Sequence, residues 1–336
     1  MTKPYQNIAV IGAGAWGTAL AQVFAVAGRS VILYARDAGL ADSINQTKLN
    51  SLYLAGIPLH PHIQATADLS AALLGANIVL LATPTQFVRE TLTKMRTHLP
   101  AHVPLVNCAK GIEIASGKIL SEVAVDIVPE HPYAVLSGPT FASEVAKGLP
   151  TAVTLATTAA AGTAQKLVEA LSSKTFRPYL SADPVGAEIS GAVKNVIAIA
   201  CGIVEGKGLG QNAKAAVMTR GMAEIKRLGM KKGAAAETFL GLSGIGDLTL
   251  TSHSMTSRNY SLGFSLGQGH SLEKTMAERC TVAEGVSTAQ AVATAAKHWQ
   301  VDMPICAAVN QILHHAADVD DIIRELLARH LKPESA

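Results

Sequence analysis

The segment NIAVIGAGAWG, residues 7–17, decides the fold of this chain. Residues 8–11 are apolar and predict a buried strand, and the glycines that follow open an apolar helix that runs to about Gly28. A second strand pattern occupies residues 30–34. This order of strand, glycine loop, helix and strand is the setting in which a G-x-G-x-x-G motif binds a dinucleotide.

Each glycine of the loop has its own physical task. Gly12 permits the tight turn, Gly14 lets a pyrophosphate approach the backbone, and Gly17 lets the helix pack against the strand. Ala15 and Trp16 lie in the first helical turn, where free N–H groups and the positive end of the dipole attract phosphate. We therefore expect these five residues to bind a dinucleotide cofactor, and the alternative is a glycine-rich structural turn.

The end of the second strand indicates which dinucleotide. Arg36 could hold a 2′-phosphate through a forked, charge-assisted contact, whereas Asp37 could accept a hydrogen bond from a ribose hydroxyl. These residues predict NADP, with NAD tolerated. The alternative is a solvated pair of charges on a loop.

Composition bounds the function classes. The chain has 336 residues, of which 49% are hydrophobic and 16% charged, so two domains with large cores are expected. A net charge of +3 suits small anionic ligands better than nucleic acid. The four cysteines form no CxxC pair, which indicates reduced thiols and a cytoplasmic protein. The apolar residues 8–28 could pass for a membrane span, but the spacing of their glycines and the strand that follows argue against one.

Further strand patterns cover residues 77–82, 104–108, 133–137, 151–157 and 176–180, with helices at 86–99 and 159–171. Residues 1–182 are therefore predicted to form a Rossmann-type, doubly wound α/β domain. Ligands of such sheets lie beyond the carboxyl ends of the strands, where Lys110, Gly138 and Thr140 are expected. The alternatives are a solvent lysine and an ordinary strand-to-helix turn.

Residues 183–336 predict an all-α domain that carries the substrate and the catalytic groups. An apolar helix opens at Asp183-Pro184, where Asp183 is the expected N-cap. Further helices are expected near residues 213–228, 257–266, 284–299, 304–315 and 318–332.

Lys194 interrupts the apolar helix at the start of this second domain. Burial lowers the pKa of an ammonium group toward values that suit acid–base chemistry, although a lysine can also extend from a core helix to solvent. Asp247 and Thr251 stand four residues apart and share one helical face, so they could pair with Lys194 or bind a substrate hydroxyl. The alternative for Asp247 is helix capping.

A helix that opens at Ser257 with Arg258 and Asn259 predicts an oxyanion site, for which phosphate is the natural ligand. The alternative is a capped surface helix with a solvent arginine. Glu284 lies in the first turn of a later helix, where a carboxylate is favourable on capping grounds alone.

Taken together, these segments resemble the bacterial type of NAD(P)-dependent glycerol-3-phosphate dehydrogenase. Two departures are visible, because residue 15 is alanine where serine is common and residue 252 is serine where cysteine is common. The matching segments occur in order: GAGAWGTAL (12–20), CAKGIE (108–113), SGPTFA (137–142), GAVKNVIA (191–198), GDLTLT (246–251), SRN (257–259) and EG (284–285).

The resemblance implies hydride transfer between NADPH or NADH and C2 of dihydroxyacetone phosphate, without a metal ion. It implies that Lys194 exchanges a proton with the C2 oxygen, and that Lys110 contacts substrate and nicotinamide. It also implies that Asp247 and Thr251 orient Lys194 and the substrate. It further implies substrate contacts at Gly138, Thr140, Ser257, Arg258 and Asn259, and cofactor contacts at Ala142, Arg258, Val282 and Glu284.

The same resemblance implies a supply of sn-glycerol 3-phosphate for phospholipid synthesis and a possible homodimer. The low net charge predicts no nucleic-acid partner, and the glycine spacing predicts no membrane span. Two other functions stay open at this point. One is a 6-phosphogluconate or β-hydroxyacid dehydrogenase relative, and the other is a non-catalytic NADP-sensing protein.

Overall fold

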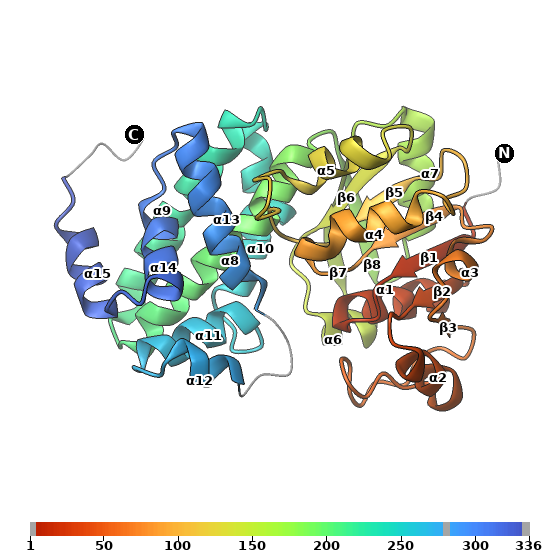
Figure 1. Cartoon of the computed structure of the whole chain (residues 1–336), viewed down its shortest axis with the longest axis horizontal. Coiled ribbons are helices and arrows are strands. Elements are labelled where there is room, and N and C mark those ends of the chain that lie inside the picture. The colour runs from red at the N-terminus through yellow and green to blue at the C-terminus, as the bar shows by residue number, and fades with distance from the viewer. Residues whose placement is uncertain (1–4, 278–282, 331–336) are drawn as a thin grey trace.

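A computed structural model of the chain describes residues 5–277 and 283–330. An eight-stranded sheet with helices on its faces forms one half of the molecule, and helices alone form the other half (Figure 1). The predicted fold class, a Rossmann-type sheet followed by an all-α region, is confirmed. The sheet order is β3-β2-β1-β4-β5-β6-β7-β8, and its first six strands have the dinucleotide-binding order 3-2-1-4-5-6.

Strands β1 to β6 are parallel, β7 runs antiparallel to β6, and β8 is parallel to β7. The strands are β1 (Asn7–Ile11), β2 (Ser30–Tyr34), β3 (Gln64–Thr66), β4 (Ile78–Leu81), β5 (Leu105–Asn107), β6 (Tyr133–Ser137), β7 (Thr151–Thr157) and β8 (Phe176–Ser181). The helices of the sheet region are α1 (Ala15–Val26), α2 (Ala38–Thr47), α3 (Leu69–Leu73), η1 (Thr85–Phe87), α4 (Val88–Met95), α5 (Leu120–Ile127), α6 (Ala142–Ala146) and α7 (Ala161–Leu171). Those of the helical region are α8 (Pro184–Gly206), α9 (Gly210–Lys231), η2 (Ala236–Leu240), η3 (Leu242–Gly246), α10 (Asp247–Thr251), α11 (Arg258–Gly267), α12 (Leu272–Ala277), α13 (Glu284–Trp299), α14 (Pro304–His314) and α15 (Val319–Leu327).

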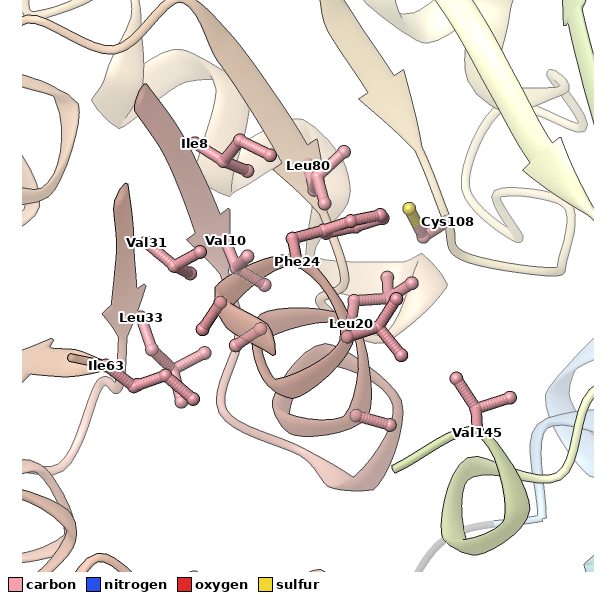
Figure 2. Packing of buried hydrophobic residues seen from close by; sticks show 14 of the residues in the cluster. Ile8, Val10, Leu20, Phe24, Val31, Leu33, Ile63, Leu80, Cys108 and Val145 are labelled. Atoms are coloured by element: carbon pink, nitrogen blue, oxygen red, sulfur yellow. The ribbon is translucent and has the colours of Figure 1, made fainter. Parts of the chain in front are cut away.

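The central strands are buried on both faces, which explains their continuous apolar sequences. Ile8 and Val10 of β1 point into one core, whereas Ala9 and Ile11 point into another on the opposite face. Helix α1 covers the first face, where Phe24 lies close to Val10 and Leu80 (Figure 2). The glycine loop at the start of α1 is thereby fixed above the carboxyl end of β1.

Helix α8 is the core of the helical region (Figure 1). All of its residues from 186 to 204 are buried, and it contacts α9, α10, α11, α13 and α14. Asp183 is its N-cap and accepts a hydrogen bond from the Gly186 N–H at 2.8 Å, as the sequence predicts. By length and composition α8 could cross a membrane, but the window that passes this test is entirely buried in the protein.

Helices α8 and α11 cross with their backbones in direct contact. A Cβ atom added at Gly202 would lie 2.1 Å from the Tyr260 carbonyl oxygen, and one at Gly206 would lie 2.2 Å from that of Phe264. In return, a Cβ atom at Gly263 would lie 2.0 Å from the Ile199 carbonyl oxygen. Glycines four residues apart on both helices therefore set how closely the helices approach.

The structure differs from the sequence predictions at several boundaries. The helix predicted over 86–99 is replaced by η1 and the shorter α4, because residues 96–99 turn ahead of Pro100, which disfavours helix in the residue before it. The sequence does not predict α2, β3, α3, α5, η2 or α12. Helix α15 ends at Leu327, and residues 331–332 of its predicted span lie outside the described residues. Strand β8 ends at Ser181 and helix α8 begins at Pro184. The predicted division into domains at 182/183 falls between these two elements and stays a prediction.

Substitution of Gly202 by alanine should destabilise the protein by roughly 1–3 kcal/mol or more, because the new methyl group forces α11 away from α8. The measurement is the free energy of unfolding from urea denaturation. The matched control is Gly162→Ala in α7, where an added Cβ atom meets nothing within 4 Å. That variant should stay within about 1 kcal/mol of the unsubstituted protein, with any change stabilising. Equal stability of the two variants would contradict the close crossing.

Candidate active site

The glycine loop after β1 has the geometry of a dinucleotide cradle. Gly12 has φ +121°, and a Cβ atom there would lie 2.7 Å from the Ala82 carbonyl oxygen. A Cβ atom at Gly17 would lie 1.9 Å from the Gly12 carbonyl oxygen. Neither position has room for a larger residue. At Gly14 the added atom would meet nothing within 4 Å, so the loop faces open space on the side where a pyrophosphate would lie.

The start of α1 is suited to an anion. Its N-cap, Gly14, offers no side-chain hydrogen bond, and the first turn carries no acidic residue. The backbone N–H groups of Ala15 and Trp16 are therefore not capped by a side chain. The indole Nε1 of Trp16 is buried and has no hydrogen-bond partner among the described residues. These features fit the phosphate part of a nicotinamide dinucleotide.

Arg36 and Asp37 have different environments at the end of β2. The Asp37 carboxylate accepts a hydrogen bond from the Leu40 N–H at 2.7 Å and so caps α2. Arg36 is exposed, and it makes no hydrogen bond or ion pair with any described residue. Arg36 is thus available for a ligand phosphate, whereas one oxygen of Asp37 already serves the fold.

One buried carboxylate joins two lysines from different halves of the molecule. Asp247 Oδ1 accepts from Lys194 Nζ at 2.7 Å, and Asp247 Oδ2 accepts from Lys110 Nζ, also at 2.7 Å. Thr251 Oγ1 accepts from Lys194 Nζ at 2.6 Å. Lys194 is 6% exposed and does not extend to solvent. Of the roles that the sequence leaves open for Asp247 and Thr251, the pairing with Lys194 is the one present in the structure.

The hydrogen bonds of the two ammonium groups leave donors unused. An ammonium group carries three N–H donors. Lys194 donates to Asp247 and Thr251, and Lys110 donates to Asp247 and to the Gly138 carbonyl oxygen at 3.1 Å. Within the described part of the chain, one N–H of each lysine is therefore left for a ligand. Two such donors beside one carboxylate can hold and polarise a single oxygen atom.

The pKa of Lys194 fits proton transfer near neutral pH. The pKa of Lys194 is lowered to about 8 as the net result of opposing effects: burial lowers it most, the Asp247 carboxylate raises it, and the positive charge of Lys110 lowers it. A group with this pKa can both give and take a proton under ordinary conditions.

A π-helical turn delivers Asp247 to the lysines. It is η3, which contains Gly244 at φ −94° and ψ −108°, a non-helical conformation, and α10 begins directly after it. Irregular turns of this kind often occur at functional sites. Because α10 starts at Asp247, its first and last residues, Asp247 and Thr251, both face Lys194.

The loop that carries Lys110 is fixed to the first half of the molecule. Gln86 donates to the Ile112 carbonyl oxygen at 2.8 Å and accepts from the Ile114 N–H at 3.0 Å. Arg89 forms a forked ion pair with Glu113, at 2.8 and 2.9 Å. Lys110 is therefore held at the carboxyl edge of the sheet, as its position after β5 predicts.

The predicted oxyanion site at the start of α11 is partly occupied by protein contacts. Ser257 caps α11 through the Tyr260 N–H, as predicted. Asn259 donates to Asn195 and accepts from the Gly285 N–H, both at 2.9 Å, and so joins α8, α11 and α13. Arg258 is exposed.

Glu284, Gly138 and Thr140 lie near the two lysines. Burial raises the pKa of Glu284, whereas the positive charges of Arg258, Lys110 and Lys194 lower it, so the start of α13 faces this cluster. Gly138 has φ +146°, and Thr140 donates to its carbonyl oxygen at 3.2 Å. Ala142 is the first residue of α6. Val282 lies outside the described residues.

Some polar residues of the site were not predicted. Thr85 and Ser137 have buried hydroxyl groups without a partner among the described residues, and both lie at the carboxyl edge of the sheet. Glu188 is buried in α8, where the sequence predicts an apolar helix and no role for this residue. Its signal in the sequence is a second charged residue in that helix, six positions before Lys194. Among the described residues, no group of three or more His, Cys, Asp or Glu is arranged to hold a metal ion.

Comparison with known families agrees with this geometry. Residues 7–163 match the sequence profile of the NAD-dependent glycerol-3-phosphate dehydrogenase N-terminus, and residues 183–324 match that of the C-terminus. The described site draws on both segments, because Lys110 lies in the first and Lys194 and Asp247 lie in the second.

Similar proteins cover nearly the whole chain. Glycerol-3-phosphate dehydrogenase (NAD(P)+) from Rhodospirillum rubrum is 56% identical over 334 residues, which are 99% of this chain and 95% of that protein. The enzyme of that name from Parvibaculum lavamentivorans is 51% identical and matches 100% of both chains. The crystal structure of glycerol-3-phosphate dehydrogenase from Coxiella burnetii superposes with a TM-score of 0.93 at 37% identity, covering 97% of this chain and 99% of that one. The chain therefore belongs to the family of NAD-dependent glycerol-3-phosphate dehydrogenases.

Proposed function

We propose that this protein interconverts dihydroxyacetone phosphate and sn-glycerol 3-phosphate with NADPH or NADH. The observation that carries the proposal is the pair of lysines that share the buried Asp247 at the carboxyl edge of the dinucleotide-binding sheet. A ketone oxygen that receives both free N–H groups would lie where negative charge develops during its reduction.

In this mechanism a bound nicotinamide supplies a hydride to C2 of the substrate. Lys194 donates a proton to the C2 oxygen as charge gathers there, and in the reverse direction it removes that proton. Lys110 stabilises the same oxygen and remains charged. Asp247 and Thr251 hold the ammonium group of Lys194 in place through the contacts at 2.7 and 2.6 Å.

The substrate phosphate is proposed to bind at Ser257, Arg258 and Asn259, with Gly138 and Thr140 beside the carbon chain. The charges support an anionic substrate, because Lys110, Lys194 and Arg258 outnumber Asp247 and Glu284. Asn259 commits one amide hydrogen to Asn195, which leaves the other for a phosphate oxygen.

The proposed cofactor contacts follow the cradle and the start of α13. The glycine loop and the first turn of α1 would hold the pyrophosphate, and Arg36 would hold the 2′-phosphate of NADP. Lys110 and Arg258 would lie close to both ligands. The full proposed set is Gly12, Gly14, Ala15, Trp16, Gly17, Arg36, Lys110, Ala142, Arg258, Val282 and Glu284.

We further propose that the protein supplies glycerol 3-phosphate for phospholipid synthesis in the cytoplasm, that it assembles as a homodimer, and that residues 1–182 and 183–336 act as cofactor and substrate domains.

The direct test of the activity is loss of NADPH absorbance on addition of dihydroxyacetone phosphate. A parallel assay with 6-phosphogluconate and NADP tests the related dehydrogenase activity. Binding of NADPH without turnover of either substrate would favour a non-catalytic sensor.

Substitution of Lys194 by methionine should reduce turnover of dihydroxyacetone phosphate by at least about 10²–10⁴-fold, since both the proton donor and its charge are lost. Methionine keeps the apolar stem, so the buried helix should fold and NADPH should still bind. Single-turnover kinetics measure the chemical step, and NADPH fluorescence measures binding. Near-normal turnover in this variant would contradict the assignment of Lys194.

The two reaction directions should depend on pH in opposite ways. Reduction needs protonated Lys194, so its kcat/KM should fall as the pH rises through the pKa of about 8. Oxidation of glycerol 3-phosphate needs the neutral amine, so its kcat/KM should rise through the same range. Initial rates from pH 6 to pH 10, at substrate concentrations well below KM, test this expectation. Parallel profiles in both directions would exclude a single titrating lysine.

Substitution of Arg36 by alanine should raise the KM for NADPH much more than that for NADH. Loss of a charge-assisted contact to the 2′-phosphate costs about 1.5–3 kcal/mol. Steady-state assays with both cofactors compare the two effects within one variant, so NADH is the internal control. Equal increases of KM would remove Arg36 from the 2′-phosphate site.

A further inference from the structure

Glu188 is a buried acidic residue with no role in the mechanism above. It lies on α8, is 5% exposed, and accepts four hydrogen bonds. Tyr133 Oη donates to its Oε1 at 2.7 Å, and Asn107 Nδ2 donates to the same oxygen at 3.3 Å. The N–H and the hydroxyl of Ser121 donate to its Oε2 at 3.2 and 2.6 Å.

All four donors come from the sheet half of the molecule. Asn107 ends β5, Tyr133 begins β6, and Ser121 lies in the first turn of α5. Glu188 itself precedes Lys194 on α8 by six residues. This carboxylate therefore fastens the helix that carries Lys194 to three separate elements around the strand that leads to Lys110.

Asn107 extends this connection to Lys110. Its Oδ1 accepts from the Ala109 N–H at 3.0 Å, and its Nδ2 donates to the Ala109 carbonyl oxygen at 3.2 Å. The Asn107 side chain thus shapes the turn immediately before Lys110 while it also contacts Glu188. A continuous path of contacts leads from Glu188 through Asn107 and Ala109 to the second lysine.

We propose that Glu188 is a positioning residue that sets the distance between Lys194 and Lys110 across Asp247. Each lysine is rooted in a different half of the molecule, and both must reach one carboxylate at 2.7 Å. A displacement of reacting groups by about 1 Å can cost about 10²-fold in rate. The inference rests on the proposed function, because it assigns Glu188 a role in that reaction.

Glutamine at position 188 would keep the size of the side chain but could not accept all four hydrogen bonds. If its amide nitrogen faced Ser121, it would oppose a backbone N–H that can only donate. If it faced Asn107, it would oppose an NH₂ group that cannot be turned over, because Asn107 Oδ1 is needed by the Ala109 N–H. Either orientation breaks one end of the connection.

The test measures kcat for reduction of dihydroxyacetone phosphate together with the Kd of NADPH. In Glu188→Gln, kcat should fall about ten- to hundredfold while the Kd changes less than about threefold. Asn107→Ala breaks the same path at the turn and should give a similar loss, and it replaces the first variant if that variant does not fold. The control is Glu224→Gln, which alters another buried glutamate that caps α14 through the Ile305 and Cys306 N–H groups. It should keep a normal kcat even if its stability falls.

A normal kcat in Glu188→Gln, or a fall of kcat in Glu224→Gln as large as that in Glu188→Gln, would overturn the positioning role. If the unsubstituted protein does not reduce dihydroxyacetone phosphate, the proposed function fails instead.

Discussion

A buried ammonium group and a partly buried one lie side by side here, and a carboxylate between them stabilises both. An isolated ion in a protein interior costs several kcal/mol of desolvation, and two like charges add repulsion. Asp247 offsets both the desolvation cost and the repulsion, since each of its oxygens accepts a hydrogen bond from one lysine. The carboxylate leaves the cluster with excess positive charge, so an anionic ligand completes its electrostatic balance.

This arrangement depends on accurate packing of elements that are distant in sequence. Lys110 follows a strand, Lys194 lies inside a core helix, and Asp247 begins a helix of five residues. Glycines on α8 and α11 let these two helices pack in close contact. Asn259 of α11 bonds to Asn195 of α8 and to Gly285 of α13, and so holds the three helices together. The loop of Lys110 has its own support from Gln86 and Arg89. Rigid surroundings reduce the reorganisation that the charged groups need during a reaction.

The sequence predicts those parts of the fold in which a residue pattern is compatible with only one local structure. The glycine loop and the Asp183 cap follow from spacing alone. For Lys194 and Asp247 the spacing leaves alternatives, a lysine that extends to solvent and a capping carboxylate, and only the resemblance to a known family brings the two residues together. The antiparallel β7 does not follow, because strand direction depends on how the whole sheet closes. Short elements such as α3 lack a readable period. The four contacts of Glu188 come from residues between 55 and 81 positions away, so no local pattern announces them.

The apolar character of α8 has a consequence before the protein has folded. The segment Pro184–Gly206 has the length and hydropathy of a membrane-spanning helix while the chain is still being synthesised. Lys194 lies close to the midpoint of this segment, where a lysine raises the free energy of insertion into a bilayer by about 2.5–3.5 kcal/mol. The same ammonium group that shares Asp247 in the folded protein therefore also opposes entry of the nascent segment into a lipid bilayer.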